Sequence, residues 1–330
     1  MSNINNIYRN LLDEILTNGQ VYEDPNRKGV LRKQIPSAVI QYDLANGYPI
    51  IGVKQTYPKA AFNEMKAFTM GVTTLKGLHE LGIRFWDQDA FNYFKRTQKT
   101  LTVSTSETEH KQVEITDEDE FKNYFFSAVK LGSITGDLGK IYSYQMRNWG
   151  GHFDQLNHVL ERLKVNPRST KNVVTMWNPA DANECALTPC HRDFEFLVEE
   201  VSSDEDTPKY KLSIKWNQHS VDTFLGLPMN IMYYADMVYA FAHYLNMIPG
   251  RIEGHLTNVH LYDNTWDKAK DVLNRSTGVT FEPVHIETLF PHHWENLDDY
   301  LRQLDFDANI KLTGYKHLGR VDAEMLPYSN

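Results

Sequence analysis

Residues 231–245 read IMYYADMVYAFAHYL, and a helix built from them is apolar on nearly every face. Asp236 and His243 are the interruptions in that apolar surface. A helix of this kind is typical of the interior of a large domain, because a surface helix keeps one polar face. We therefore expect residues 231–245 to form the helix at the centre of the core.

The rest of the chain contains segments with the hydrophobic periodicity of helices and segments with that of strands. Apolar residues recur at helical spacing in residues 4–15, 59–70 and 153–163. Strand patterns occupy residues 38–42, 50–53, 172–177, 194–201, 210–216, 255–262 and 279–286, and residues 46–49 read as a turn between the first two. Without an internal repeat or a linker-like boundary, this order predicts one α+β domain over residues 1–330.

Residues 96–132 differ in composition from the segments around them. Residues 97–120 contain few large apolar side chains and many Thr, Ser and Glu. A segment of this kind is typical of a long excursion from a compact domain. We expect an insertion at about 96–132 that takes no part in the chemistry.

Composition and charge exclude several classes of protein. The 330 residues are 41% hydrophobic, with no apolar run near the roughly 20 residues that a membrane span needs. The net charge of -9 gives no basic field for a long nucleic acid. The first residues carry Arg9, Asp13 and Glu14 in place of an apolar signal segment, and the chain has two cysteines. We expect a globular protein of the cytoplasm, with neither a membrane nor a long nucleic acid as partner.

Generic motifs for metal and phosphate chemistry are absent from the sequence. Glu80 follows His79, but Ile83 stands where the second histidine of HExxH belongs, and no Walker loop, GxGxxG or GxSxG occurs. The pair His292 and His293 has no acid or thiol neighbours at ligand spacing, which favours an exposed loop. We expect no metal site.

Two residues are candidates for catalysis rather than for packing in the core. Cys190 lies between Pro189 and His191 at the start of an expected strand, where a depressed thiol pKa would make it a nucleophile. The alternative is a buried, inert cysteine. Glu64 stands on the apolar stripe of the helix expected at 59–70, which is unusual for an acid, and the alternative is a surface acid in the N-terminal turn.

The sequence motifs around these residues resemble those of thymidylate synthases and the related nucleotide hydroxymethylases. Residues 136–139 (GDLG), with Tyr142, Arg147 and Trp149, look like the family's GDLGxxYxxQxRxW stretch, and residues 187–191 contain its PCH nucleophile word. The remaining matches are residues 218–222 (QHSVD), 224–230 (FLGLPMN), 260–262 (HLY) and 314–325, with Lys54, Glu64, Trp86 and Asp87 at the early positions. The resemblance spans most of the chain and implies a mixed β-sheet core with a buried central helix and flanking helices.

This resemblance also implies a reaction. Cys190 would attack C6 of a pyrimidine nucleotide, and C5 would then accept a one-carbon unit from 5,10-methylenetetrahydrofolate. Glu64 would move protons to the pyrimidine O4, with His191 and Tyr142 in the same network. Asn230 fits the N3–H and O4 of uracil, whereas relatives that act on cytosine carry Asp there, so we expect dUMP as the substrate. A plainer role for Asn230 is the N-cap of the helix that follows.

The other implied roles concern the two substrates and the assembly. The nucleotide-binding positions are Arg27, Lys171, His219, Ser220, Asn230, His260 and Tyr262. The folate-binding positions are Lys54, Trp86, Asp222, Leu225 and Gly226. The resemblance further implies a homodimer, because members of the family donate paired arginines across a two-fold interface.

The sequence departs from the family where the phosphate is held and at the end of the chain. His219 stands at the position of one family arginine, and the paired arginines fall on Thr170 and Lys171. Since Arg binds phosphate in a bidentate manner and His and Lys do not, we expect weaker monophosphate binding and a less activated Cys190. Glu195 and Met229 replace the family's Gln and Phe. Residues 326–330 extend the tail by about three residues beyond the family's usual end.

The altered tail bears on the product. A tail that closes fully over the folate excludes water, so that hydride gives a methyl group, whereas a retained water would give a hydroxymethyl group. From these departures we expect a dUMP hydroxymethylase, of the kind that viruses use to make modified DNA precursors. The alternatives are thymidylate synthesis, which shares every step up to the methylene intermediate, and an inactive binding relative.

Overall fold

Helix α8 (Gly226–Tyr244) runs through the middle of the molecule and is buried along almost its whole length. The computed structural model describes residues 3–98, 100–104, 110–114, 118–201, 210–324 and 326. The helix starts at Gly226, before the start at residue 231 expected from the sequence, and Pro228 fits its first turn, where a missing N–H costs little. Asn230 therefore lies inside the helix, which corrects its interpretation as an N-cap.

A seven-stranded mixed sheet lies against α8. Its order is β1-β2-β9-β7-β6-β5, and β8 pairs with β9. The strands are β1 (Gln20–Glu23), β2 (Leu31–Asp43), β5 (Val173–Thr175), β6 (His191–Glu200), β7 (Tyr210–Gln218), β8 (Val221–Asp222) and β9 (Ile248–Tyr262). Strand β9 runs parallel to β7 and β8, and the other pairs are antiparallel. The expected α+β fold with a mixed sheet and a buried central helix is confirmed.

One aromatic stack fixes α8 on the sheet. The ring of Trp216 on β7 lies parallel to that of Tyr234 on α8, with centroids 4.5 Å apart. Gly254 on β9 is the partner of Trp216 in the parallel ladder, and a Cβ there would stand 2.4 Å from the indole ring. The close approach of the indole to the backbone therefore requires glycine at position 254.

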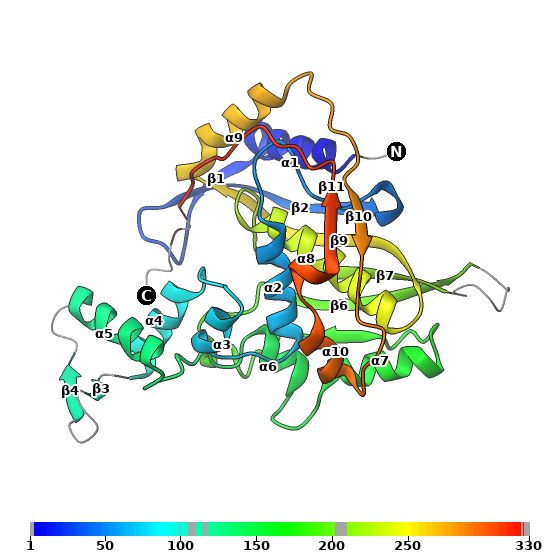
Figure 1. Cartoon of the computed structure of the whole chain (residues 1–330). Coiled ribbons are helices and arrows are strands. Elements are labelled where there is room, and N and C mark those ends of the chain that lie inside the picture. Colours follow the sequence, from blue (N-terminus) through cyan, green and yellow to red (C-terminus); the bar gives the residue numbers. More distant parts are fainter. Residues whose placement is uncertain are drawn as a thin grey trace.

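Flanking helices enclose this core. Helix α2 (Pro58–Thr69) packs on α8, while α1 (Ile4–Asn18) and α9 (Asp263–Ser276) pair at one end of the molecule (Figure 1). The smaller elements are α3 (Leu75–Glu80), α6 (Tyr142–Arg147), α7 (Gln155–Val165), β10 (His285–Thr288), α10 (Leu297–Gln303), α11 (Phe306–Asn309) and β11 (Ile310–Thr313). Among the described residues, none of these helices combines the length and the apolar character needed to cross a membrane.

The second strand expected near the N-terminus, at residues 50–53, is not formed. Ile50, Ile51 and Val53 are buried, as an apolar run predicts, but the backbone bonds individually to separate partners rather than to a ladder. Gly52 N donates to the Asn5 side chain (2.6 Å), and its carbonyl accepts from Leu318 N (2.9 Å). The segment is a buried connector whose backbone groups are satisfied one by one.

The described residues between 96 and 132 form a lobe beside the main body (Figure 1). Its described elements are the end of α4 (Asp87–Thr97), the hairpin β3 (Thr100–Ser104) and β4 (His110–Glu114), and α5 (Glu118–Leu131). Helices α4 and α5 are joined by a cluster of phenylalanine rings that includes Phe91, Phe94, Phe121 and Phe125. These rings are continuous with the buried core of the main body, and the status of this segment as an insertion stays a prediction.

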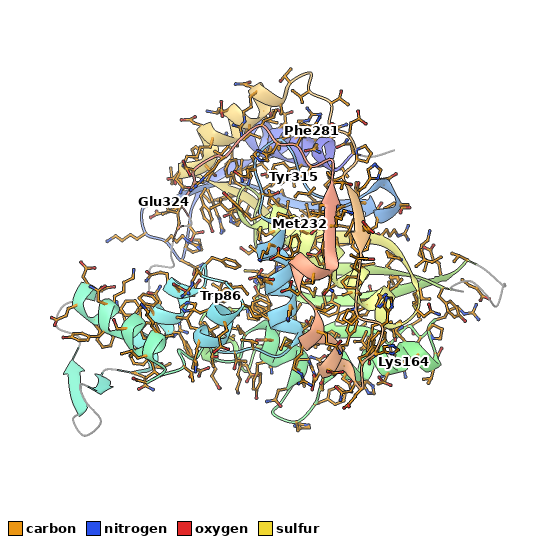
Figure 2. The ribbon with its side chains drawn as sticks, viewed as in Figure 1. Trp86, Lys164, Met232, Phe281, Tyr315 and Glu324 are labelled. Atoms are coloured by element: carbon orange, nitrogen blue, oxygen red, sulfur yellow. The ribbon has the colours of Figure 1, made fainter. Side chains whose placement is uncertain are left out.

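The C-terminal segment runs back along the connector at residues 50–56. Tyr315 (Figure 2) accepts a hydrogen bond from Thr56 N at its hydroxyl (3.0 Å), and Gln55 N donates to the Gly319 carbonyl (2.9 Å). Farther on, Asn264 donates to the carbonyl of Glu324 (3.0 Å). Of the expected tail extension at 326–330, the structure describes residue 326, while residues 327–330 lie outside the described residues, as does residue 325.

The stack over Gly254 gives a stability prediction. The variant Gly254→Ala should lower the free energy of unfolding by about 1–3 kcal/mol, because the added methyl group displaces the Trp216 ring. Urea denaturation followed by circular dichroism measures the change. Val165→Ala, at an 84% exposed position at the end of α7, is the control and should change stability by less than about 0.5 kcal/mol. Equal effects of the two substitutions would contradict the packing argument.

Candidate active site

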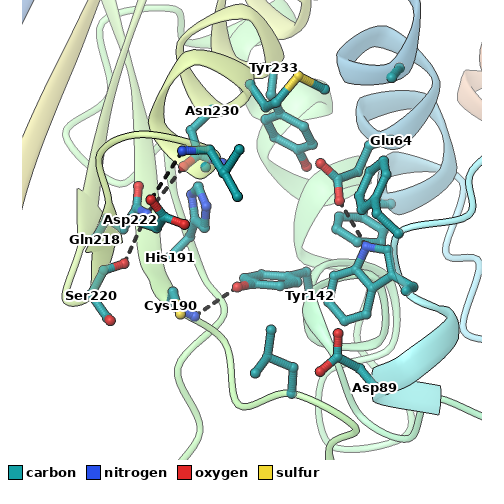
Figure 3. Close-up of a pocket in the computed structure, with 18 of the residues that line it drawn as sticks. Glu64, Asp89, Tyr142, Cys190, His191, Gln218, Ser220, Asp222, Asn230 and Tyr233 are labelled. Atoms are coloured by element: carbon teal, nitrogen blue, oxygen red, sulfur yellow. Dashed lines mark hydrogen bonds between the residues drawn. The ribbon is translucent and has the colours of Figure 1, made fainter. Parts of the chain in front are cut away.

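A cavity of about 400 Å³ opens between α2, α4, α8 and the ends of β6, β7 and β9. Most residues that the sequence predicts for catalysis and binding line it, although they come from distant parts of the chain. They are Arg27, Glu64, Trp86, Tyr142, Cys190, His191, Ser220, Asp222, Leu225, Gly226, Asn230, His260 and Tyr262. Several of them face one another across the cavity in Figure 3.

Cys190 lies at the cavity wall, immediately before β6. Its backbone N–H donates to the hydroxyl of Tyr142 (2.8 Å), which fixes the turn that presents the thiol. Burial raises the pKa of Cys190 above its ordinary value, the positive charge of Arg27 lowers it, and the charge of Asp89 raises it again. The thiol is therefore protonated at neutral pH until a bound group favours the thiolate.

Glu64 projects from α2 into the same cavity. Its Oε1 accepts a hydrogen bond from the indole N–H of Trp86 (2.9 Å; Figure 3). Burial among apolar side chains raises its pKa to about 7, against the opposing effect of the Trp86 hydrogen bond. A carboxyl group with this pKa can release and regain a proton near neutral pH.

His191 and Tyr142 line the cavity together with the thiol and Glu64. His191 Nδ1 is 2.8 Å from the hydroxyl of Tyr234, and its ring packs edge-on against Tyr142. Burial lowers the pKa of His191 to about 3, so its imidazole is neutral under physiological conditions. The ring can hold a hydrogen bond, but it cannot supply a proton as an imidazolium.

Asn230 is oriented by a neighbour from β7. Gln218 Nε2 donates to Asn230 Oδ1 (3.2 Å) and to the carbonyl of Ser220 (3.1 Å; Figure 3). Because an amide oxygen has two lone pairs, Oδ1 can accept one further hydrogen bond while Nδ2 donates another. The side chain thus presents one acceptor and one donor in a fixed direction.

Arg27, His260 and Tyr262 form a second polar group of the cavity. Arg27 donates to the Tyr262 hydroxyl (2.9 Å) and to the carbonyl of Leu326 (2.9 Å), so the C-terminal segment reaches the cavity. His260 is 1% exposed, and its Nδ1–H donates to the carbonyl of Asn258 (2.7 Å). Burial lowers the pKa of His260, which leaves a neutral ring whose Nε2 is buried with no hydrogen-bond partner among the described residues.

The residues expected around the folate divide into two groups. Trp86, Leu225 and Gly226 line the cavity, and so does Asp222, whose Oδ1 accepts from Phe224 N (2.9 Å) and Leu225 N (3.1 Å). Lys54 is not among the lining residues: its side chain is buried over the Phe224 ring, with Nζ 5.0 Å from the ring centroid. Burial lowers the pKa of Lys54 to about 8, while the charge of Asp222 opposes that shift.

Two of the expected nucleotide-binding residues lie outside the cavity wall. Lys171 is exposed on the loop before β5. His219 packs edge-on against Trp177 (4.8 Å between centroids), with its backbone N–H bonded to the Cys190 carbonyl (2.9 Å). Arg168 pairs with Glu200 (3.5 Å). Burial lowers the pKa of His219, and the positive charge of Arg192 lowers it further. Arg192 is thus the nearby cation that accompanies His219.

Sequence reasoning missed several residues of the site. Gln218 belongs to the QHSVD word, so its position beside Asn230 was accessible from the sequence. Tyr234 was assigned to the core, where its ring does lie, but its hydroxyl bonds to His191. Asp89 carried no signal, since an acid in the first turn of a helix is ordinary, and its place in the cavity depends on the tertiary fold.

Comparison with known proteins identifies the relatives of this arrangement. The family model described as thymidylate synthase matches residues 6–327. The chain belongs to the thymidylate synthase family. It is 32% identical to a thymidylate synthase of Mycoplasma genitalium over 270 residues (82% of this chain, 85% of the relative), and 32% identical to that of Enterobacteria phage T4 over 275 residues (81% and 80%). Identity to a thymidylate synthase of Staphylococcus haemolyticus is 27% over 318 residues (90% and 95%).

Membership of the thymidylate synthase family confirms the resemblance seen in the sequence and identifies the chain as an enzyme, a folate-dependent transferase acting at C5 of dUMP. The names of the three relatives favour the methyl product over the hydroxymethyl product that we expected. Within the described part of the chain, no group of three or more His, Cys, Asp and Glu side chains is placed to hold a metal ion.

The electrostatics of the thymidylate synthase-type cavity predict the reactivity of Cys190. At pH 7 iodoacetamide should alkylate Cys190 more slowly than it alkylates the free thiol of glutathione. The thiolate is the nucleophile, and burial raises the pKa of the Cys190 thiol. Arg27→Ala should slow the reaction further, because the charge of Arg27 lowers the pKa of Cys190, and Asp89→Asn should speed it, because the charge of Asp89 raises that pKa. The thiolate fraction changes about tenfold for each pKa unit. Peptide mass spectrometry separates Cys190 from the buried Cys185. Faster labelling of Cys190 than of glutathione would contradict this description.

Proposed function

We propose that the protein transfers the one-carbon unit of 5,10-methylenetetrahydrofolate to C5 of dUMP and reduces it to the methyl group of dTMP. The observation that carries this proposal is one cavity containing a cysteine, a carboxyl group with pKa about 7 and an oriented amide, in a chain of the thymidylate synthase family. Each of these groups supplies a separate requirement of the reaction.

Cys190 is the proposed nucleophile. Its sulfur adds to C6 of the pyrimidine, and the electron pair of the C5–C6 bond makes C5 nucleophilic toward the one-carbon donor. Because the pKa of the thiol is raised in the described structure, substrate binding must favour the thiolate. Arg27 supports this role, since its charge lowers the pKa of Cys190.

Glu64 is the proposed proton carrier for the pyrimidine O4. Its pKa of about 7 lets it donate a proton as negative charge develops on O4 and recover one afterwards. The neutral rings of His191 and Tyr142 then position water between Glu64 and the nucleotide. Trp86 holds the carboxyl group in place through its indole N–H.

Asn230 is proposed to select uracil over cytosine. Its Oδ1 accepts the uracil N3–H and its Nδ2 donates to O4, and the bond from Gln218 keeps the amide in this orientation. Cytosine would present an acceptor at N3 and an amino group at C4, which leaves two buried polar pairs mismatched.

The sugar and the phosphate have separate proposed partners. The unpartnered Nε2 of the neutral His260 accepts from the sugar 3′-hydroxyl, with Tyr262 beside it. Arg27 and Ser220 take the phosphate, assisted by His219. Among the described residues Arg27 is the arginine that lines the cavity, and one arginine predicts weaker monophosphate binding than a cluster would give.

The apolar wall supports reduction to a methyl group. Phe68, Phe85, Trp86 and Leu187 line the same cavity as Leu225 and Gly226, the residues proposed to contact the folate. Trp86 is 5% exposed and packs edge-on against Phe68 and Tyr142. A wall of this kind limits water at the methylene carbon, so that hydride transfer from the folate prevails over hydration.

A homodimer and a cytoplasmic location belong to the same proposal. Val39 is 58% exposed and the Lys215–Glu195 ion pair lies on neighbouring strands, so side chains of the sheet are available to a second copy. Lys171 lies outside the cavity of its own chain and would assist the phosphate site of the partner in such a dimer.

The direct test is product analysis by mass spectrometry after incubation with dUMP and methylenetetrahydrofolate. We expect dTMP and dihydrofolate as principal products, and a loss of at least about 10³-fold in turnover for Cys190→Ser. Cys185→Ser is the matched control, since Cys185 is buried away from the cavity lining. Principal formation of 5-hydroxymethyl-dUMP with tetrahydrofolate would overturn the methyl assignment. Full turnover of Cys190→Ser would overturn the covalent mechanism.

The pKa of Glu64 predicts a feature of the pH profile. Protonated Glu64 is the proposed acid, so the limb of kcat/KM that reports this group should fall as pH rises through about 7. In Glu64→Gln this inflection should disappear and activity should drop by about 10²–10⁴-fold. Glu80→Gln, on α3 and outside the cavity lining, is the control. An inflection near pH 7 that survives in Glu64→Gln would assign it to another group.

A further inference from the structure

Asp89 is a carboxylate in the cavity for which the reaction above has no role. It belongs to the first turn of α4 and lines the cavity together with Cys190 and Trp86. Figure 3 shows its carboxyl group directed into the cavity, below the ring of Tyr142. No described residue gives this carboxyl group a hydrogen bond or an ion pair within 4 Å, although the charge of Arg27 acts on it from a greater distance.

The surroundings of Asp89 make it the polar exception in an apolar wall. Phe85, Trp86 and Leu187 line the same region, and burial raises the pKa of Asp89 to about 6 despite Arg27. A largely buried carboxylate without a partner costs free energy unless a donor satisfies it. Water that enters this part of the cavity therefore binds at Asp89.

The position of Asp89 relative to Cys190 places that water near the reacting carbon. Asp89 and Cys190 line the same cavity of about 400 Å³, and Figure 3 shows both side chains around the ring of Tyr142. The charge of Asp89 also raises the pKa of the Cys190 thiol. Once Cys190 is bonded to C6, the substituent on C5 is a few covalent bonds from Sγ. A water held by Asp89 on this side of the cavity is thus a neighbour of the C5 methylene.

We propose that Asp89 holds and activates a water molecule that adds to the C5 methylene, which gives the enzyme 5-hydroxymethyl-dUMP as a second product beside dTMP. This inference rests on the proposed function, because both products come from the same methylene intermediate. Asp89 sets the share of the intermediate that takes up water instead of hydride.

The step is balanced without a reductant. After tetrahydrofolate has left, Asp89 takes a proton from water, the water oxygen forms a bond to the methylene carbon, and the electron pair of the exocyclic double bond moves toward O4. That pair then forms the C5–C6 double bond as the C6–S bond breaks and Cys190 leaves as a thiolate. Nothing is oxidised, so tetrahydrofolate is released unchanged, whereas the methyl route converts it to dihydrofolate.

The test compares both products in water enriched with ¹⁸O. Wild-type enzyme with dUMP and methylenetetrahydrofolate should give dTMP together with 5-hydroxymethyl-dUMP that carries ¹⁸O. In Asp89→Asn the ratio of hydroxymethyl to methyl product should fall at least about tenfold, because an amide cannot take the proton. Asp87→Asn is the matched control: Asp87 lies on the same turn of α4 but bonds to His79 (2.7 Å) outside the cavity lining.

Three results would overturn the inference. These are turnover of wild-type enzyme to dTMP alone, an unchanged product ratio in Asp89→Asn, and an equal loss of both products in that variant, which would make Asp89 a binding residue. The first of these leaves the proposed function intact. Absence of any C5-modified product from wild-type enzyme would remove the proposed function as well. Circular dichroism confirms that both variants fold.

Discussion

The packing of α8 on the sheet is the constraint on which the rest of the structure depends. The Trp216–Tyr234 stack, made possible by Gly254, sets the distance between helix and sheet. Gly226, Asn230 and Tyr234 approach the cavity from α8, whereas the cysteine and its histidine stand at the start of β6. A change in this packing would therefore move the amide and the nucleophile relative to each other.

Burial along α8 also explains an acid in the middle of the core. Asp236 is fully buried, and its Oδ1 accepts a hydrogen bond from Tyr48 (3.0 Å). Burial raises the pKa of Asp236 well above the ordinary value, which favours the neutral form over an unpaired charge in the core. A protonated carboxyl group with a tyrosine partner is compatible with an otherwise apolar environment.

The same desolvation determines the chemistry of the cavity. It raises the pKa of Glu64 into the neutral range, keeps His191 uncharged and holds Cys190 as a thiol. These shifts have one physical cause but different consequences. The acid becomes able to exchange protons, the imidazole becomes a fixed hydrogen-bonding group, and the nucleophile depends on the substrate for its ionisation.

The sequence predicted the parts of this protein that depend on local pattern. The stripe carrying Glu64, the strands around 194–216 and the buried helix were all recognisable, because periodicity reports which face of an element is covered. The family's sequence motifs then predicted many of the residues that line the cavity. The connector at 50–53 was wrongly expected to be a strand, because its backbone partners, such as Asn5 and Leu318, are distant in sequence. Asp89 was not predicted, and Lys54 was expected at the folate although its side chain lies over the Phe224 ring. In both cases tertiary packing decides whether a charged side chain faces a cavity or a buried ring.

The covalent role of Cys190 is the central claim, and one measurement tests it most directly. Wild-type protein is incubated with methylenetetrahydrofolate and 5-fluoro-dUMP, whose C5 fluorine cannot leave as a proton does, and is then analysed by intact and peptide mass spectrometry. The account predicts a covalent adduct containing nucleotide and folate that maps to Cys190 and is absent from Cys190→Ser. An adduct on Cys185, an adduct that persists in Cys190→Ser, or no adduct at all would contradict it.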